Sequence, residues 1–235
     1  MAYNLNRIYS GLTLILCLLI SYLLHLDLIL FLIIITLITY DIYVNNLLNL
    51  KSFLGAIFLF LLLIYLDKYL ILGLYPISII ILISFFLSNY FHQYLLFFNL
   101  VILFFVFSSY ELIQNERHIF YIIISLSFIN DTCAYIVGNL IKGPLIFPKI
   151  SPKKTWSGTS TSIFLSFCLL FYYFNFTIFI SIFVSLLFFL GDMYFSFIKR
   201  LNKLKDFSNI IPGHGGILDR IDSFLFPIIL INLSL

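Results

Sequence analysis

Charge is scarce in this sequence. Lys and Arg contribute 13 of the 235 residues and Asp and Glu contribute 10, whereas 63% of the residues are hydrophobic and the mean hydropathy is +1.13. Soluble globular domains are about 25% charged, so the composition excludes an ordinary soluble domain. We expect a chain that lies in a lipid bilayer and has no nucleic-acid partner.

Cysteine is scarce too, and its positions exclude two common kinds of site. Cys17, Cys133 and Cys168 all lie inside apolar runs, with no CxxC pair and no histidine spacing typical of zinc. We therefore expect three buried thiols that act as small hydrophobic side chains, with no disulfide and no structural metal.

The sequence also lacks the alternation of polar and apolar residues that membrane barrel strands require. Runs such as LILFLIIITLITY are apolar on every face, and a helix needs about 20 such residues to cross the hydrocarbon core. Lipid admits only helices or closed barrels, so we predict an all-α integral membrane protein, a polytopic bundle of about 8–9 transmembrane helices. The expected spans lie near residues 8–25, 28–44, 50–66, 69–87, 93–110, 119–139, 161–174 and 177–198, followed by a short apolar segment at 223–235.

Long polar linkers and internal repeats are missing as well. The breaks between apolar runs are brief, which argues against a separate soluble domain. Without repeats, a transporter built from duplicated halves is disfavoured. The amino-terminal run has a basic flank but no small-residue cleavage site, so we expect an uncleaved first helix.

The few basic residues are concentrated in two loops and their edges. These are Lys142, Lys149, Lys153, Lys154, Lys199, Arg200, Lys203, Lys205 and Arg220. The positive-inside tendency places both loops on the cytoplasmic side, and the expected number of spans places Arg7 there too. We therefore expect the functional site near the cytoplasmic face.

Four acids lie close to these loops: Asp131, Asp192, Asp219 and Asp222. Asp192, Ser196 and Lys199 are spaced at i, i+4 and i+7, so they form one polar stripe on an apolar helix. Asp219 and Asp222 are three residues apart and share a face. Inserting an acid into a membrane helix costs about 2.5–3.5 kcal/mol on insertion scales. A lone acid there usually caps a helix or forms an interhelical hydrogen bond. Several converging carboxylates instead suit Mg²⁺, which prefers oxygen ligands and keeps substrate phosphates in its shell.

The first basic loop reads FPKISPKKTWSG. Its prolines favour an extended backbone, and Lys149, Lys153 and Lys154 offer ammonium groups to anions. The alternative is that these lysines are attracted to anionic lipid headgroups.

The second loop holds PGHGG between a basic arm and a DRxD pair. Gly213, Gly215 and Gly216 can adopt positive φ and let backbone N–H groups approach an oxyanion closely. A glycine-rich turn is usually only a turn, but here it connects cationic and acidic residues around His214.

These residues together resemble the signature of CDP-diacylglycerol synthases, also called phosphatidate cytidylyltransferases. The matching positions are Ser196, Lys199, Arg200, Lys205, Asp206, Ser208, Pro212, His214, Gly215, Gly216, Asp219, Arg220 and Asp222. SPKKTWSG and DTCAY are similar to the family's two upstream motifs, so the resemblance covers roughly residues 128–223. Two positions depart from the family's common pattern, Ser157 and Asn139.

The resemblance implies transfer of a cytidylyl group from CTP to phosphatidic acid, with Mg²⁺ and a possible second cation held by Asp192 and Asp219. It implies catalytic roles for Asp192, Asp219, Asp222, Lys199 and His214. It implies substrate-binding roles for Ser151, Lys153, Lys154, Ser196, Arg200, Lys205, Gly215, Gly216, Arg220 and Asp131.

We accordingly divide the chain into N-terminal transmembrane helices, residues 1–115, and a catalytic membrane domain with the two basic loops, residues 116–235. The expected location is a bacterial inner membrane, and a homodimer is implied by the resemblance alone. Three alternatives remain: a cytidylyltransferase for another lipid phosphate, a transporter or channel for an anionic solute, and an inactive paralogue. A transport path would distribute ionisable residues across the membrane depth, whereas these acids cluster towards one face.

Overall fold

The computed structural model describes residues 2–47, 93–211 and 215–234, and most of them are helical. The longer helices are α1 (Ala2–Leu23), α2 (Asp27–Val44), α5 (Gln93–Asn115), α6 (Arg117–Ile141), α7 (Trp156–Cys168), α8 (Ile178–Leu201) and α10 (Leu225–Ser234). The short elements are the π-helix η1 (Leu169–Tyr173) and α9 (Leu218–Ile221). The spans expected at 50–66 and 69–87 lie outside the described residues.

Four of the described helices are long and apolar enough to cross a membrane: Asp27–Val44, Phe97–Asn115, Arg117–Ile141 and Ile178–Leu201. Each coincides with an expected span, because an uninterrupted apolar run of this length has no stable alternative in lipid. The short span expected at 161–174 is made of α7 and η1 together. The chain is therefore a mostly helical protein of membrane-spanning character.

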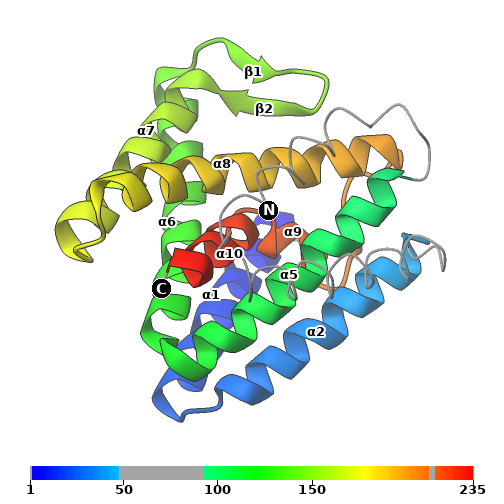
Figure 1. Ribbon diagram of the computed structural model, residues 1–235. Helices are drawn as coiled ribbons and strands as arrows, with labels where there is room; N and C mark the ends of the chain where they lie inside the picture. Colours follow the sequence, from blue (N-terminus) through cyan, green and yellow to red (C-terminus); the bar gives the residue numbers. More distant parts are fainter. Residues whose placement is uncertain (1, 48–92, 212–214, 235) are drawn as a thin grey trace.

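A β-hairpin interrupts the helices and was not predicted. Strands β1 (Leu145–Phe147) and β2 (Ser151–Thr155) pair antiparallel, with Leu145 opposite Thr155. Figure 1 shows the hairpin beyond the amino-terminal end of α7 and above α8 in that view. Helix α6 ends at Ile141, and the prolines that follow cannot donate to a helical ladder. The first basic loop is thus extended, as expected, but it is also paired with itself.

Helix α10 forms the centre of the core. It packs against α5 and α8 and touches α6, as Figure 1 shows. Its apolar side chains are almost all buried, among them Phe226 at 2% exposure and Ile228 at 0%. Ten residues reach only about 15 Å, too short for a span, so this all-apolar segment is buried by protein rather than by lipid.

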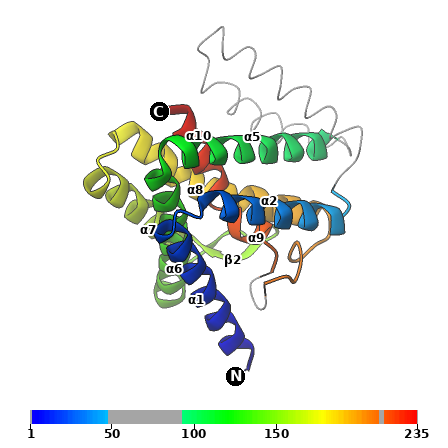
Figure 2. The same cartoon turned by 90° about the horizontal axis from the view of Figure 1, so that it is seen from below.

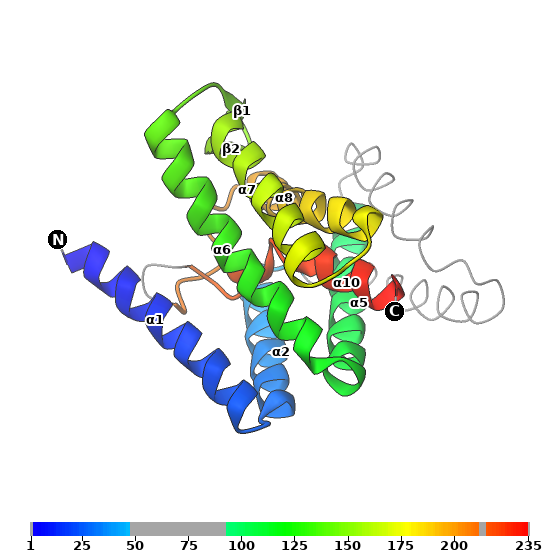
Figure 3. The same cartoon turned by 90° about the vertical axis from the view of Figure 1, so that its left-hand side faces the viewer.

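Helix α1 projects away from the other helices toward its amino terminus (Figures 2 and 3). Many of its apolar side chains are exposed, and Cys17 is exposed with them. The expectation of three buried cysteines is therefore wrong for Cys17, because it lies on a helix face that no described element covers. Cys133 and Cys168 are half-buried, and all three thiols are free.

A polar cluster fastens α1 and α2 to the start of α6. Asp27 accepts a hydrogen bond from the Tyr121 hydroxyl at 2.6 Å and pairs with Arg117 at 3.3 Å. Arg117 also donates to the Tyr22 carbonyl at 2.6 Å. The cluster lies at the start of α6, whereas the hairpin follows the end of that helix.

Asp27→Ala should lower the free energy of unfolding by about 1–3 kcal/mol, because it removes the carboxylate that accepts from the buried Tyr121 hydroxyl and pairs with Arg117. Thermal unfolding of the purified protein in detergent measures the loss. Thr36→Ala, at an exposed position of the same helix, is the control. Equal midpoints for Asp27→Ala and wild type would contradict this account of the cluster.

Candidate functional site

A cavity of about 330 Å³ lies between α6, β2, α7 and α8. Five of the residues predicted from the sequence line it: Asp131, Ser151, Lys153, Lys154 and Asp192. Asp131 comes from α6, Asp192 from α8 and both lysines from the hairpin. The hairpin therefore brings the first basic loop to the acids of two helices.

An ion pair joins the hairpin to α8 inside this cavity. The Lys154 ammonium contacts the Asp192 carboxylate and lies 5.3 Å from the centre of the Phe189 ring. Ser196 donates to Asp192 Oδ1 at 3.4 Å, which confirms that these two α8 side chains share a face. Each charged side chain of the pair is 23% exposed, so both remain reachable from the cavity.

Gly191 lets the segment after α9 approach α8. A Cβ atom at Gly191 would overlap the carbonyl oxygen of Asp222, so only glycine fits without displacing that segment. The approach places Asp222 where its charge acts on Asp192 and on Asp131. Burial raises the pKa of the Asp222 carboxyl well above its usual range, and the Asp192 carboxylate raises it further. The charges of Lys199 and Arg220 act on Asp222 in the opposite direction, and a bound cation would likewise favour the ionised form of its carboxyl group.

Asp219 has a different environment from Asp222, although the two are three residues apart. Its Oδ1 accepts a hydrogen bond from the Lys199 ammonium at 2.7 Å, and both side chains are buried. Its Oδ2 accepts from the backbone N–H groups of Phe207 and Gly216, each at 2.9 Å. Asp219 therefore holds the glycine-rich segment onto α8.

Gly215 has φ +80°, a conformation that favours glycine. The turn at Gly215 directs the backbone N–H of the next residue, Gly216, toward Asp219 Oδ2. The predicted His214, together with Gly213, lies outside the described residues.

The two basic loops meet. Arg200 at the end of α8 donates to the carbonyl of Ile150 in the hairpin turn at 3.1 Å and to the carbonyl of Leu204 at 3.0 Å. Lys205, in contrast, is exposed and lines a separate depression beside the end of α2. The structure thus brings Arg200 to the hairpin but does not bring Lys205 to the cavity.

Arg220 lies among the acids without a full set of partners. Its charge acts on both Asp131 and Asp222, and its Nε is buried with no hydrogen-bond partner among the described residues. Ser157, one of the two departures, donates to the Lys142 carbonyl at 2.7 Å and so closes the end of α6 instead of lining the cavity.

Sequence reasoning missed the small polar residues that complete the cavity wall. These are Asn130, Thr155, Thr159, Ser162, Ser185 and Ser223. Thr159 and Ser162 are spaced at i, i+3, a helical signal that could have found them. Asn130 Oδ1 is buried and has no hydrogen-bond partner within the described parts of the chain.

The donor set suits a magnesium ion only if the substrate supplies ligands as well. In residues 2–47, 93–211 and 215–234, no three His, Cys, Asp or Glu side chains are close enough to enclose a metal. Mg²⁺ usually binds one or two carboxylates together with substrate phosphates. Asp192, with Asp131 beside it, lines the cavity and has 23% of its side chain exposed, whereas the Asp219 side chain is only 4% exposed and does not line the cavity.

Comparison with known proteins identifies the family. The sequence profile of the cytidylyltransferase family matches residues 5–235, so the chain belongs to the cytidylyltransferase family. No solved structure matches the chain.

Three curated relatives that the chain is similar to are named phosphatidate cytidylyltransferase. The Rickettsia conorii protein is 41% identical over 118 residues, covering 44% of this chain and 51% of the relative. The Rickettsia prowazekii protein is 36% identical over 135 residues, covering 51% and 58%, and the Staphylococcus aureus (strain COL) protein is 36% identical over 135 residues, covering 54% and 52%. The chain spans about half the length of the curated relatives it matches.

Gly191→Ala should destabilise the protein by about 1–3 kcal/mol, because the added methyl group forces Asp222 away from α8. Thermal unfolding in detergent measures the change. Leu190→Ala, at a neighbouring position that is 41% exposed, should have little effect. If the two variants unfold at the same temperature, the close approach at Gly191 does not matter.

Proposed function

We propose that this protein transfers a cytidylyl group from CTP to phosphatidic acid and releases pyrophosphate. The observation that carries the proposal is the meeting of Lys153 and Lys154 with Asp131 and Asp192 in one cavity. The curated relatives named phosphatidate cytidylyltransferase support it. No feature of the described residues favours transport of an anionic solute.

The reaction is a substitution at phosphorus. A phosphate oxygen of phosphatidic acid forms a bond to the α-phosphorus of CTP, and the bond from that phosphorus to the bridging oxygen of the β-phosphate breaks. The products are CDP-diacylglycerol and pyrophosphate. A phosphate monoester has a second pKa of about 6, so the attacking oxygen is already anionic and needs no strong general base.

The protein's contribution is then positioning and charge stabilisation. Lys153 and Lys154 lie on strand β2 of the hairpin and can bind phosphate oxygens as point charges. Lys154 is held by Asp192 in the described structure, so phosphate binding would exchange one anionic partner for another. Lys199 remains paired with Asp219 and keeps the glycine-rich segment in place beside the substrates.

Magnesium would be held by Asp192, with Asp131 and Asp222 in support, and would supply neutralisation of the phosphate charge. A metal-binding role for Asp219 stays a prediction, and it would require Lys199 to release Oδ1. Catalytic participation of His214 and a second cation stay predictions as well.

We further propose that the protein is a multi-pass protein of a bacterial inner membrane, with about 8–9 spans and both basic loops on the cytoplasmic side. The contact between Arg200 and the Ile150 carbonyl supports a common side for the two loops. Phosphatidic acid would then present its headgroup to the cavity from the same leaflet. A homodimer remains an expectation from the family resemblance.

Asp192→Asn should abolish Mg²⁺-dependent pyrophosphate release from CTP and phosphatidic acid, because it removes the carboxylate charge but keeps the side-chain size. The assay uses purified wild type and variant in detergent–lipid micelles, with release measured over time. Lipid-linked cytidylate from labelled CTP is the second readout.

The control for that assay is a change of the lipid that accepts the cytidylyl group. Wild type should release pyrophosphate with phosphatidic acid and not with diacylglycerol, which lacks the attacking phosphate. Full activity of Asp192→Asn would remove its proposed role, and an inactive wild type with every lipid phosphate offered would contradict the proposed function.

Lys154→Ala should raise the KM for CTP by roughly 10-fold, the equivalent of about 1.4 kcal/mol, because one phosphate contact is lost. Lys149→Ala removes the same charge from the turn of the same hairpin but does not line the cavity, so its KM should stay near the wild-type value. Equal KM values for the two variants would favour the alternative that these lysines only contact lipid headgroups.

A further inference from the structure

The end of α2 carries a buried acid that the sequence motifs do not include. Asp41 is 0% exposed, and its Oδ2 accepts a hydrogen bond from the backbone N–H of Leu218 at 2.9 Å. Leu218 immediately precedes Asp219. Asp41 therefore contacts the glycine-rich segment directly, although 177 residues separate the two partners.

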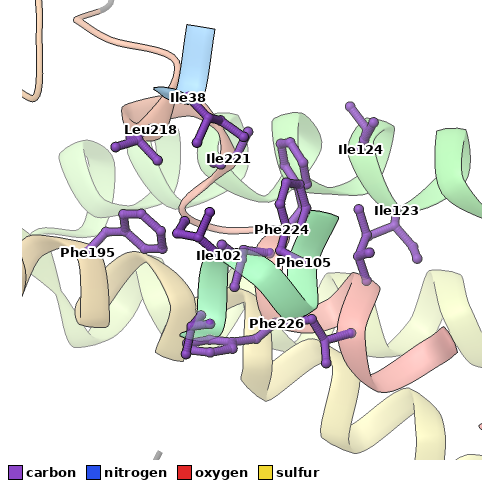
Figure 4. Packing of buried hydrophobic residues seen from close by; sticks show 14 of the residues in the cluster. Ile38, Ile102, Phe105, Ile123, Ile124, Phe195, Leu218, Ile221, Phe224 and Phe226 are labelled. Carbon is purple, nitrogen blue, oxygen red and sulfur yellow. The ribbon is translucent and has the colours of Figure 1, made fainter. Parts of the chain in front are cut away.

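The packing around Asp41 is close and specific. A Cβ atom at Gly216 would overlap Asp41 Oδ2, so this glycine of the signature leaves room for the carboxylate of α2. Ile38, one turn earlier on α2, packs beside Leu218 and Ile221 of α9 (Figure 4). The face of α2 that carries Asp41 is therefore the face that meets α9.

Asn45, the residue that follows α2, adds a second contact. Its Nδ2 donates to the carbonyl of Phe207 and to the carbonyl of Asp41 at 2.7 Å. Phe207 lies before the glycine-rich turn and Leu218 lies after it. Helix α2 and Asn45 thus hold Phe207 and Leu218, and the backbone amides of Phe207 and Gly216 bind Asp219.

We propose that Asp41 and Asn45 are positioning residues for the transfer reaction, holding Phe207 and Leu218 in place so that Asp219 stays on Lys199 and Asp222 stays beside Asp192. The proposal rests on the proposed function. It assigns a role in the reaction to the end of α2, which lies outside the signature residues of the two basic loops.

Asp41 is poorly suited to a purely stabilising role. Its Oδ1 is buried with no hydrogen-bond partner among the described residues, and desolvation of a carboxylate opposes folding. One hydrogen bond to a backbone amide contributes only about 0.5–1.5 kcal/mol net, or somewhat more when charged. Its effect should therefore appear more in the geometry of the bound segment than in global stability.

The test compares Asp41→Ala, Asp41→Asn and Asn45→Ala with wild type. Asp41→Ala and Asn45→Ala should lower kcat by roughly 10- to 100-fold, the scale expected when catalytic groups shift by about 1 Å. The KM for CTP should change little, because Lys153 and Lys154 lie on the hairpin. Asp41→Asn keeps an acceptor for the Leu218 N–H and should restore kcat to within a few-fold of wild type.

Asp27→Ala is the matched control. Asp27 is also a buried acid on α2 that accepts hydrogen bonds, but it lies at the other end of the helix. This variant should unfold at lower temperature and keep its kcat. A kcat loss in Asp27→Ala as large as in Asp41→Ala would overturn the positioning role, because general destabilisation would then explain both.

A second readout does not depend on the reaction. Lys203 and Lys205 are exposed just before residue 207, so trypsin should nick this segment faster in Asp41→Ala and Asn45→Ala, and at the wild-type rate in Asp27→Ala. Unchanged nicking or an unchanged kcat in both Asp41→Ala and Asn45→Ala would overturn the proposal. If Asp41→Ala does not fold, Asn45→Ala decides. An inactive wild type would contradict the proposed function alone, because the rate of trypsin cleavage still shows whether Asp41 and Asn45 hold Leu218 and Phe207 in place.

Discussion

The buried ion pair between Lys199 and Asp219 is the contact on which the site depends. It joins α8 to the segment between α8 and α10, and the second carboxylate oxygen of Asp219 binds two backbone amides of that segment. Phe207, whose amide is one of these donors, packs its ring against Phe98 and Phe195 in the core. The same short segment is thus fixed by charge on one side and by apolar packing on the other.

An apolar bundle can hold this many charges only because most of them have partners. Asp27 has Arg117, Asp219 has Lys199, and Asp192 has Lys154. Asp131 and Asp222 lie beside the cavity, where the charges of Asp192 and Arg220 act on both of them in opposite directions. That is where a divalent cation and substrate phosphates would complete the electrostatic balance.

Much of the fold follows from the sequence, because long apolar runs have few stable alternatives in lipid. The helical stripe of Asp192 and Ser196 was predicted from spacing, and the structure confirms it. Pairings between residues far apart in the chain could not be predicted from the sequence. The hairpin depends on strands that pair across a turn. The roles of Asp219 and Asp222 diverge because Asp219 binds Lys199 and two backbone amides, whereas the Asp222 backbone packs on Gly191 of α8. Asp41 was missed because a single acid in an apolar run gives no sign of its distant partner.

We propose that the carboxylates of the cavity and the phosphates of CTP would bind the same Mg²⁺ ion. The most direct test is equilibrium binding of a non-hydrolysable CTP analogue to the purified protein, measured by calorimetry at increasing Mg²⁺ concentration. The account predicts that wild type binds the analogue at least about 10-fold more tightly with saturating Mg²⁺, a gain of about 1.4 kcal/mol, and that Asp192→Asn loses this gain. Affinity that is independent of Mg²⁺ in the wild-type protein would contradict it.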